Sequence, residues 1–476
     1  MKSIVKGLAL ALAFFSINYH SFADVRLPAV FSDNMVLQQQ SAVTIWGWCS
    51  PAEKIYVTNS WSNTVDSTGG NGFAKWKLTV NTPAAGGPYT LTIKGSNTIT
   101  LKNVMIGEVW VCSGQSNMQW SSLNGIQEID AALPDAANAN IRFFQIPQTT
   151  AEYPQDDCPA TWTQCNARTL KSFSAVAYFF GKKLQADLNV PIGLINTSWG
   201  GTPAEVWTPG ELVENDAELK AAAEKLTPVN WWPTVPGATY NAMIAPVTPF
   251  NIAGAIWYQG ESNVGTSQTY DRLMRTMIGS WRKAWNKDIP FYYVQIAPFT
   301  YGAKHTGALL REAQTKTMEY PKTGMVVITD LVENVKDIHP RQKKKVGERL
   351  AGWALAETYS KAGGSYKSPV YKSFDISKNK MTVHFDHAED GLVLKAGDKK
   401  ATEFYIAGDD KVFVPADVKI EGNTVVVSNK QVKSPVAVRF SFSNTGMGNI
   451  FNKAGLPVNP FRTDNWEVDT GKEEYK

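Results

Sequence analysis

The sequence is poor in charge, in histidine and in cysteine. Charged residues make up only 19% of the 476 residues, and the formal net charge is +4. So weak a charge gives no electrostatic case for binding nucleic acid or an anionic membrane surface. The four cysteines are too few for a disulfide scaffold, and no Cys-x-x-Cys pair or His-Glu-x-x-His run suggests a metal site. We therefore expect neither a metal nor a cofactor, and the sequence implies no protein partner.

Beyond its beginning, the chain has no apolar run long enough to cross a bilayer. At the beginning, Lys2 and Lys6 precede an apolar stretch at 7–15, and small residues stand three positions and one position before a cleavage point after Ala23. This pattern is typical of a secretory signal peptide. It predicts that residues 1–23 are removed and that the protein is exported, to the periplasm or to the outside of the cell, without a membrane anchor.

Export would place the cysteines in an oxidising compartment, where disulfides form and persist. Cys158 and Cys165 are close enough in sequence to close a short loop, so a disulfide between them is one possibility. Cys112 lies in an apolar run and is expected to pack as a small hydrophobic residue.

The pattern of apolar residues divides the mature chain into three parts. Residues 24–103 and 366–476 alternate apolar and polar residues between turn clusters, which predicts two β-sandwich-like modules. Residues 104–365 alternate short apolar strands with helical patterns, which predicts an α/β domain with a doubly wound parallel sheet. The expected strands are 104–112, 192–196, 252–258, 291–296 and 325–329, and the expected helices are 174–188, 270–285, 307–320 and 342–359.

Polar, glycine-rich loops follow four of the expected strands. They cover residues 112–118, 196–202, 259–263 and 337–340. Each loop alone is typical of an ordinary turn, since glycine, serine and asparagine are common turn residues. Doubly wound sheets, however, bind their ligands at the carboxyl ends of the strands. The four loops together therefore predict a single site at one edge of the sheet.

Histidine is the usual base for a serine nucleophile, and few histidines are available. The mature chain has four of them, namely His305, His339, His384 and His387. The last two belong to the C-terminal β module, and His305 precedes a helix without directly following a strand. His339 follows the last strand and has an acid, Asp337, two residues earlier. We therefore expect His339 to be the base, although the residue before Pro340 can also serve simply as a helix start.

Three motifs, in this order, resemble the sialate O-acetylesterase branch of the SGNH hydrolases. They are Gly114-Gln115-Ser116-Asn117-Met118, Gln259-Gly260-Glu261-Ser262 and Asp337-Ile338-His339-Pro340. The resemblance covers most of the mature chain and implies a flavodoxin-like hydrolase domain that removes O-acetyl groups from sugars. It also implies that Ser116 is the nucleophile and His339 the base. The implied oxyanion hole consists of the Ser116 backbone N–H, a glycine N–H at Gly200 or Gly201, and a side-chain amide.

Two departures from the superfamily pattern affect these assignments. The position three residues before His339 usually carries the acid, but it is Lys336 here. Asp337 is therefore the expected orienting acid, with Glu261 as the alternative. The usual oxyanion asparagine is also missing from the second motif, and Gln259 is expected to donate its amide instead.

The resemblance implies O-acetylated sialic acid as the substrate. An acetylxylan or other glycan O-acetylesterase is the alternative, and a non-catalytic glycan-binding protein is a more distant one. Arg311 is a candidate for binding the sialate carboxylate, although a structural ion pair with a neighbouring acid is slightly favoured over this role. Trp199 and Trp257 flank the polar loops and are candidates for stacking on sugar rings. The run of lysines at 343–345 is expected to form a solvated helix face.

Overall fold

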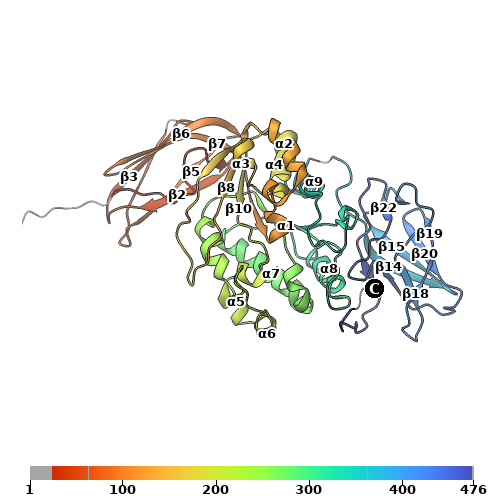
Figure 1. The fold of residues 1–476 in the computed structure, drawn as a ribbon. Coiled ribbons are helices and arrows are strands. Elements are labelled where there is room, and N and C mark those ends of the chain that lie inside the picture. Colours follow the sequence, from red (N-terminus) through yellow and green to blue (C-terminus); the bar gives the residue numbers. More distant parts are fainter. Residues whose placement is uncertain (1–23, 63, 362, 474–476) are drawn as a thin grey trace, which may run out of the picture.

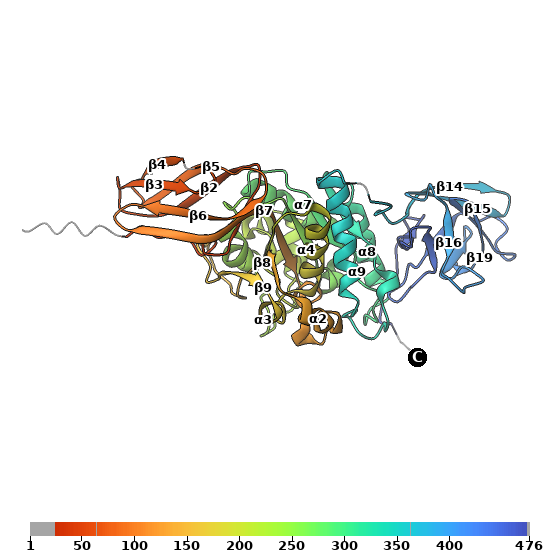
Figure 2. The same ribbon diagram turned by 90° about the horizontal axis from the view of Figure 1, so that it is seen from above.

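The computed structural model describes residues 24–62, 64–361 and 363–473. The predicted signal peptide at 1–23 lies outside these residues. A β-rich N-terminal part, a central α/β part and a C-terminal β part follow one another along a line (Figures 1 and 2). Among the described residues, none of the helices is both long and apolar enough to cross a membrane.

The central part is built on a mostly parallel sheet. Its strand order is β13-β12-β11-β7-β10-β8-β9, and only β9 runs antiparallel to its neighbour. Without β8 and β9, the order β10-β7-β11-β12-β13 is the order of a flavodoxin-like sheet. The strands are β7 (Thr98–Gly114), β8 (Asn138–Gln145), β9 (Trp162–Cys165), β10 (Ile192–Asn196), β11 (Gly254–Tyr258), β12 (Phe291–Val294) and β13 (Thr323–Val326).

Helices cover both faces of this sheet. On one face, α4 (Ala175–Leu188) and α9 (Lys343–Trp353) pack on apolar side chains such as Trp110. On the other face, α7 (Ser267–Ala284) and α8 (Thr306–Thr317) pack on side chains such as Trp257. The face of α7 that is buried is the one predicted from its helical spacing, and it includes Tyr270 and Met277. The structure thus confirms the predicted α/β architecture with a parallel sheet.

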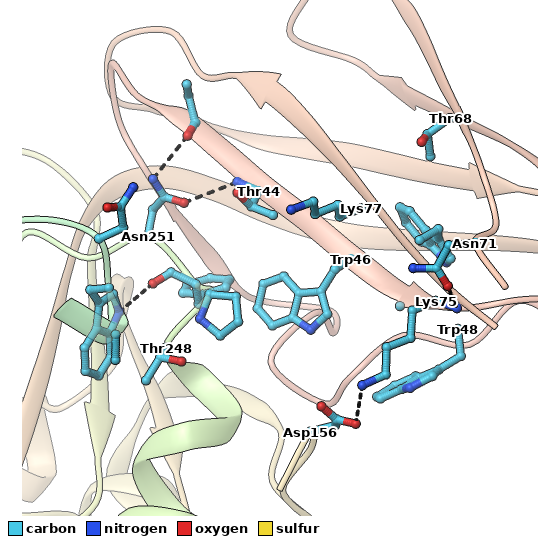
Figure 3. A pocket seen from close by; sticks show the side chains of 18 of the residues that line it. Thr44, Trp46, Trp48, Thr68, Asn71, Lys75, Lys77, Asp156, Thr248 and Asn251 are labelled. Carbon is cyan, nitrogen blue, oxygen red and sulfur yellow. Dashed lines mark hydrogen bonds and ion pairs between the residues drawn. The ribbon is translucent and has the colours of Figure 1, made fainter. Parts of the chain in front are cut away.

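The N-terminal part is continuous with the central sheet through β7. The first half of β7 pairs with β6 (Gly86–Lys94) and the second half with β10 and β11. The expected boundary between residues 103 and 104 therefore falls inside one long strand. The remaining strands are β1 (Val36–Gln38), β3 (Lys54–Asn59) and β4 (Val65–Gly69), together with the separate pair of β2 (Ala42–Trp48) and β5 (Lys75–Asn81), which faces the central part across a crevice (Figure 3).

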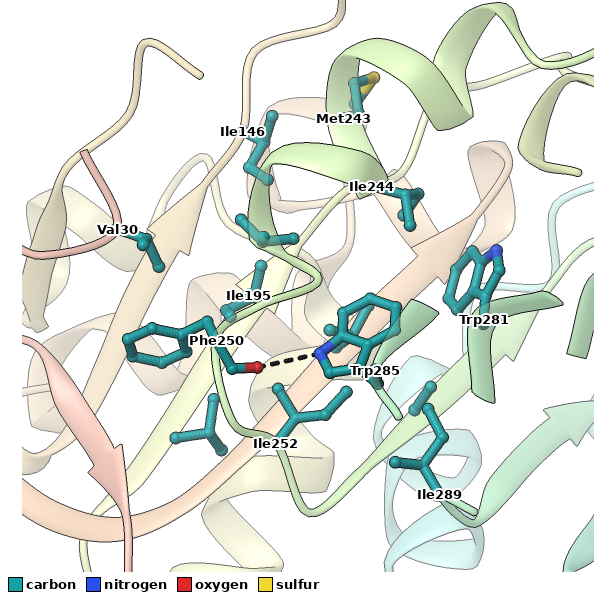
Figure 4. Packing of buried hydrophobic residues seen from close by; sticks show 14 of the residues in the cluster. Val30, Ile146, Ile195, Met243, Ile244, Phe250, Ile252, Trp281, Trp285 and Ile289 are labelled. Atoms are coloured by element: carbon teal, nitrogen blue, oxygen red, sulfur yellow. Dashed lines mark hydrogen bonds between the residues drawn. The ribbon is translucent and has the colours of Figure 1, made fainter. Parts of the chain in front are cut away.

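The N-terminal and central parts also share a hydrophobic core. Val30, from the N-terminal part, belongs to the same buried cluster as Ile195 and Phe250 of the central part (Figure 4). Trp285, which follows α7, packs in this cluster, and its indole N–H donates a 2.9 Å hydrogen bond to the Phe250 carbonyl. These contacts join the N-terminal β-sheet to the α/β part as one packed unit.

The C-terminal part is an antiparallel β module with its own core. Two four-stranded sheets, β14-β15-β20-β19 and β18-β17-β21-β23, enclose buried side chains such as Val383 and Phe440, and a further pair is β16-β22. The strands are β14 (Val370–Ser377), β15 (Lys380–Asp386), β16 (Leu392–Leu394), β17 (Phe404–Ala407), β18 (Val414–Pro415), β19 (Asp417–Glu421), β20 (Thr424–Ser428), β21 (Ala437–Phe440), β22 (Ile450–Asn452) and β23 (Phe461–Arg462).

All four cysteines are free and buried. Cys158 and Cys165 therefore do not form the short disulfide that their spacing suggested. Burial raises the pKa of both thiols to about 12, so neither thiol ionises at neutral pH. Cys112 is fully buried in the core of the central part, as its apolar surroundings predicted.

Candidate active site

Ser116 follows the carboxyl end of β7. The parallel strands next to β7 in the central sheet lie on opposite sides of it, with β10 on one side and β11 on the other, so the strand order reverses at this point. The preceding Gly114 has φ = 135°, and a Cβ there would lie 2.2 Å from the Tyr258 carbonyl oxygen on β11. Only glycine allows this close approach of the two strands. The chain then turns directly into the short helix α1 (Ser116–Gln119), which leaves the Ser116 side chain partly exposed at the carboxyl edge of the sheet.

His339 brings its imidazole to this serine from the loop after β13. Its Nε2 lies 2.9 Å from the Ser116 Oγ, which is hydrogen-bond distance. Burial, together with the nearby cations Lys343 and Arg341, lowers the pKa of His339 to about 4, although Asp337 acts in the opposite direction. The imidazole is therefore neutral at pH 7. A neutral imidazole in contact with a serine hydroxyl can act as a general base.

Asp337 lies beside His339 but contacts mainly the backbone. Its Oδ1 is 3.7 Å from the His339 Nδ1, which is longer than a hydrogen bond, and it accepts a 3.0 Å hydrogen bond from the His339 backbone N–H. Its Oδ2 accepts from the Arg341 guanidinium at 3.2 Å. Burial alone would raise the pKa of Asp337, but these two donors outweigh it and lower the pKa. Asp337 is therefore an ionised carboxylate near the far side of the imidazole.

Glu261 does not lie beside His339 but belongs to a buried polar network behind the serine. The Asn117 side chain links this network, because its amide donates to Glu261 Oε1 at 2.5 Å and to the Ile338 carbonyl at 3.0 Å. The Asn117 amide oxygen in turn accepts a 2.6 Å hydrogen bond from Lys343 Nζ. One asparagine, next to the serine, thus joins the three motif loops and the start of α9.

The prediction that residues 343–345 form a solvated helix face is wrong for Lys343. Lys344 and Lys345 are exposed, but Lys343 is fully buried, and its ammonium lies 5.3 Å from the centre of the Tyr258 ring. Burial lowers the pKa of Lys343, and burial raises the pKa of Glu261. A buried cation and a buried anion are tolerated here because the Asn117 side chain hydrogen-bonds both of them.

One of the two predicted oxyanion glycines lies directly beside the serine. The Gly200 backbone N–H donates a 2.6 Å hydrogen bond to the Gln119 side-chain oxygen, and a Cβ at Gly200 would lie 3.3 Å from the Ser116 Cβ. At Gly201, which has φ = 82°, a Cβ would lie 2.1 Å from the Trp232 ring. Gly201 therefore gives the Trp232 indole room to pack against the backbone.

The prediction that Gln259 supplies an oxyanion amide is wrong. Its side chain is fully buried, and its NH2 group donates to the Thr202 carbonyl at 3.2 Å and to the Asn263 side chain at 2.8 Å. Its side-chain oxygen accepts from the Tyr270 hydroxyl at 2.8 Å. Both donor hydrogens are thus used inside the protein, where they tie the second polar loop to the third.

Two predicted substrate-binding residues, Arg311 and Trp257, are fully buried. Arg311 has 0% exposure, and its guanidinium donates to the carbonyls of Ser443 and Asn444 in the C-terminal part. Trp257 also has 0% exposure, because it faces the core from the middle of β11 and packs edge-to-face against Trp281 at 6.1 Å. In the structure, Arg311 thus links α8 to the C-terminal part, and Trp257 packs within the core.

Partly exposed aromatic side chains do lie at the site, and most of them were not predicted. Trp120 stacks on the His339 imidazole, with 3.8 Å between the ring centroids and an interplanar angle of 21°. Trp199, which was predicted, donates its indole N–H to the Trp231 carbonyl at 3.1 Å, and the Trp231 side chain is 72% exposed. The adjacent tryptophans 231 and 232, in a segment without expected helix or strand, were the available signal for this rim.

His305, the other histidine considered as a base, lies elsewhere. Its Nδ1 contacts the Asp469 carbonyl at 3.1 Å, close to the end of the described chain. His384, on β15, is within hydrogen-bond distance of Asp375 in the C-terminal module, with 2.8 Å between Nε2 and Oδ2. Of the histidines considered from the sequence, His339 is therefore the one that the fold brings to Ser116.

Comparison with known proteins agrees with this arrangement. Residues 106–359 match the family model of the sialic acid-specific acetylesterases, a carbohydrate esterase family. The chain belongs to this family. It is 28% identical to the sialate O-acetylesterase of Homo sapiens over 455 residues, which cover 87% of this chain and 86% of the human protein. The sialate O-acetylesterase of Pongo abelii is likewise 28% identical over 435 residues, which cover 83% of each chain.

A solved structure extends the similarity to the whole architecture. The carbohydrate acetylesterase XAC1771 from Xanthomonas citri superposes with a TM-score of 0.83 at 34% identity, over 93% of this chain and 100% of that chain. The sequence resemblance to the sialate O-acetylesterases is thus confirmed, and the protein is a carboxylic ester hydrolase.

Proposed function

We propose that the protein removes O-acetyl groups from sialic acids, with Ser116 as the nucleophile and His339 as the base of an SGNH-type site. The observation that supports this most directly is the 2.9 Å contact between Ser116 Oγ and His339 Nε2 at the carboxyl edge of the sheet. The family membership and the similarity to two sialate O-acetylesterases support the substrate class.

The proposed reaction is acyl transfer to serine followed by hydrolysis. His339 Nε2 accepts the Ser116 hydroxyl proton while Oγ attacks the acetyl carbonyl carbon. The tetrahedral intermediate collapses when the bond to the sugar oxygen breaks, and His339 gives its proton to that oxygen. In the second half, a water attacks the acetyl-enzyme while His339 accepts its proton. Acetate then leaves, and the proton returns to Ser116.

The oxyanion is proposed to be stabilised by the backbone N–H groups of Ser116 and Gly200. The first N–H groups of a helix have no partner within the helix, and Ser116 begins α1. The Gly200 N–H is held by the Gln119 side-chain oxygen, so a substrate oxygen would replace that oxygen. Each such donor commonly contributes about 10²–10³ in rate. Asp337 is proposed to orient the imidazole and to stabilise its protonated form.

For a sialic acid, the substrate carboxylate needs a cation near the serine. Arg311 cannot supply it, because it is buried. Arg341 is exposed, lies 4.9 Å from the Trp120 ring and is paired with Asp337. We assign the carboxylate to Arg341, and the sugar ring to the aromatic rim that includes Trp199 and Trp231.

A second candidate substrate is an acetylated xylan or another neutral glycan. It is supported by the similarity to the Xanthomonas citri protein XAC1771, which is a carbohydrate acetylesterase. The signal-peptide pattern of residues 1–23 supports a further proposal, namely that the protein is exported and acts on acetylated glycans outside the cytoplasm.

Acetate release tests the proposal. The wild-type protein is incubated with O-acetylated sialosides, acetylated xylan and an aryl acetate, and Ser116→Ala is the matched inactive control. We expect release from all sialosides tested and loss of at least three orders of magnitude in Ser116→Ala, since the nucleophile is essential. Retention of a tenth of the wild-type rate in Ser116→Ala would refute the assignment of the nucleophile. A clear preference for xylan would move the substrate to the second candidate.

A further inference from the structure

A second open site lies far from Ser116, between the N-terminal and central parts. It is a crevice of about 950 Å³ between the outer face of the β2–β5 pair and two loops of the central part, 248–252 and 284–287 (Figure 3). Its volume falls within the range of ordinary ligand sites, about 300–1,000 Å³. It is therefore large enough for a ligand of several rings.

The crevice lies at the edge of the sheet opposite to the serine. Residues 248–252 immediately precede β11, and residues 284–287 precede β12. Ser116, in contrast, follows the carboxyl end of β7, which is parallel to both strands. The two sites thus lie at opposite ends of the same parallel strands, and a ligand in the crevice does not occupy the ester-cleaving site.

The floor of the crevice presents two tryptophans side by side on one face of β2. Trp46 and Trp48 stand at alternate positions of the strand and are both partly exposed, whereas Val43 and Ile45, which precede them on the other face, point into the core. In Figure 3 the Trp46 indole lies in the middle of the crevice, between Asn251 on one side and Trp48 on the other. The Arg26 guanidinium lies 5.6 Å from the centre of the Trp48 ring, and the parts of the two indoles that stay exposed offer flat apolar platforms for a sugar ring.

Each tryptophan has a lysine directly across the strand pair. Trp46 is paired in register with Lys77, and Trp48 is paired with Lys75. Lys75 reaches across the crevice to Asp156 of the central part, at 2.7 Å, whereas Lys77 is exposed above Trp46 (Figure 3). The rim also carries the polar side chain of Asn71. Apolar platforms bordered by hydrogen-bonding groups match a sugar ring, which has an apolar face and a polar edge.

We propose that this crevice is a saccharide-binding site, separate from the catalytic site, that holds the glycan on which the esterase acts. The proposal rests on the carbohydrate esterase family of the chain for the choice of a saccharide, and on Trp46, Trp48 and their paired lysines for the site. The lysines favour a glycan that carries carboxylates over a neutral one. Holding a chain at the crevice raises the local concentration of acetyl groups near Ser116.

Titration calorimetry of the full-length protein tests this proposal. The titrants are two unacetylated oligosaccharides, sialyllactose as the acidic one and xylohexaose as the neutral one. The protein carries Ser116→Ala throughout, so the binding result does not depend on ester cleavage. We expect Trp46→Ala and Trp48→Ala each to weaken binding about tenfold, the loss that corresponds to about 1.4 kcal/mol. Tyr56→Ala, an exposed aromatic on β3 outside the crevice, is the matched control and should bind like its parent.

Thermal unfolding of each variant separates loss of the site from loss of the fold, because Trp46 also packs edge-to-face on Phe31 at 4.5 Å. If Trp46→Ala unfolds, Trp48→Ala and Lys77→Ala still test the site. Binding of neither oligosaccharide at millimolar concentration would overturn the proposal. It would also be overturned by binding that Trp199→Ala abolishes and Trp48→Ala leaves unchanged, since that result places the ligand at the ester-cleaving site. Failure of the sialate esterase assay, in contrast, would leave the calorimetric result intact.

Discussion

Trp120 covers one face of the His339 imidazole, with 3.8 Å between the ring centroids. The same indole lies 4.9 Å from the Arg341 guanidinium, which in turn pairs with Asp337. His339 is therefore held by a flat side chain that lies only four residues after Ser116, and not by a strong hydrogen bond to an acid. Stacking of this kind fixes the plane of a ring and excludes water from its face.

Trp120→Ala should lower kcat about tenfold or more, because the imidazole loses the surface that sets its plane. Trp120→Phe keeps an aromatic face and should retain most of the activity. The measurement is kcat and KM on an aryl acetate for both variants, with thermal unfolding as the control for folding. Equal kcat in the alanine variant and the wild type would show that His339 is oriented by other contacts.

Asp337→Asn should lower kcat about 10²-fold or more, since the carboxylate that stabilises the protonated imidazole is lost. The change should also move the acid limb of the kcat/KM profile to lower pH, because the Asp337 charge raises the pKa of His339. Glu261→Gln should have the smaller effect on kcat, since Glu261 contacts Asn117 and not the imidazole. The reverse order of the two effects would assign the orienting role to Glu261.

The elements that carry the site could be predicted from local patterns. The strand at 192–196 and the helix that begins after Ser174 are found where the apolar spacing placed them. The meeting of the Ser116 and His339 loops was also predicted, because loops after parallel strands meet at one edge of the sheet, whereas the choice of Ser116 among the loop residues came from the family resemblance. The expected domain edge at 103 follows a real change of pattern, from alternating burial to continuous burial, but this change falls within one strand, β7, and does not mark a break between elements.

Burial of polar side chains depended on partners far away in the sequence. From the sequence, Lys343 is expected to be one of three exposed lysines. In the structure it is buried, because the side-chain oxygen of Asn117, on another element, accepts its hydrogen bond. From the sequence, Arg311 is a candidate substrate ligand. In the structure its guanidinium donates to the carbonyls of Ser443 and Asn444, which lie far away in the sequence. Gln259 has the right chemistry for an oxyanion hole, but Thr202 and Asn263 use its hydrogens. Such long-range pairings cannot be inferred from periodicity or motif spacing.

The two arginines at 311 and 341 should respond to mutation in opposite ways. Arg341→Met should raise KM for an O-acetylated sialoside about tenfold and leave KM for an uncharged aryl acetate unchanged, because only the sialoside loses a charged partner. Its kcat should fall on both substrates, since Arg341 also holds Asp337. An equal change of KM on both substrates would contradict a role for Arg341 in binding the carboxylate.

Arg311→Met is the matched control for that comparison. It should lower the free energy of unfolding by about 2 kcal/mol, because the Ser443 and Asn444 carbonyls lose a buried donor. The properly folded fraction should keep the wild-type KM for both substrates. Chemical denaturation measures the stability, and steady-state kinetics measure KM. A rise of KM for the sialoside alone would instead show that Arg311 binds the substrate.

Lys343→Met should shift the pH dependence of the enzyme. The activity needs a neutral His339, so the acid limb of kcat/KM reports the pKa of this group in the free enzyme, which is about 4. The Lys343 ammonium is protonated at that pH and disfavours protonation of the imidazole; without it, the pKa of His339 rises and the acid limb moves toward neutral pH. Lys344→Met, an exposed neighbour, is the matched control and should leave the limb in place. The two kcat/KM profiles on an aryl acetate measure the effect. A lower kcat with an unmoved limb would show that Lys343 supports only the packing of Asn117, because a change in packing alone does not move the titration of His339.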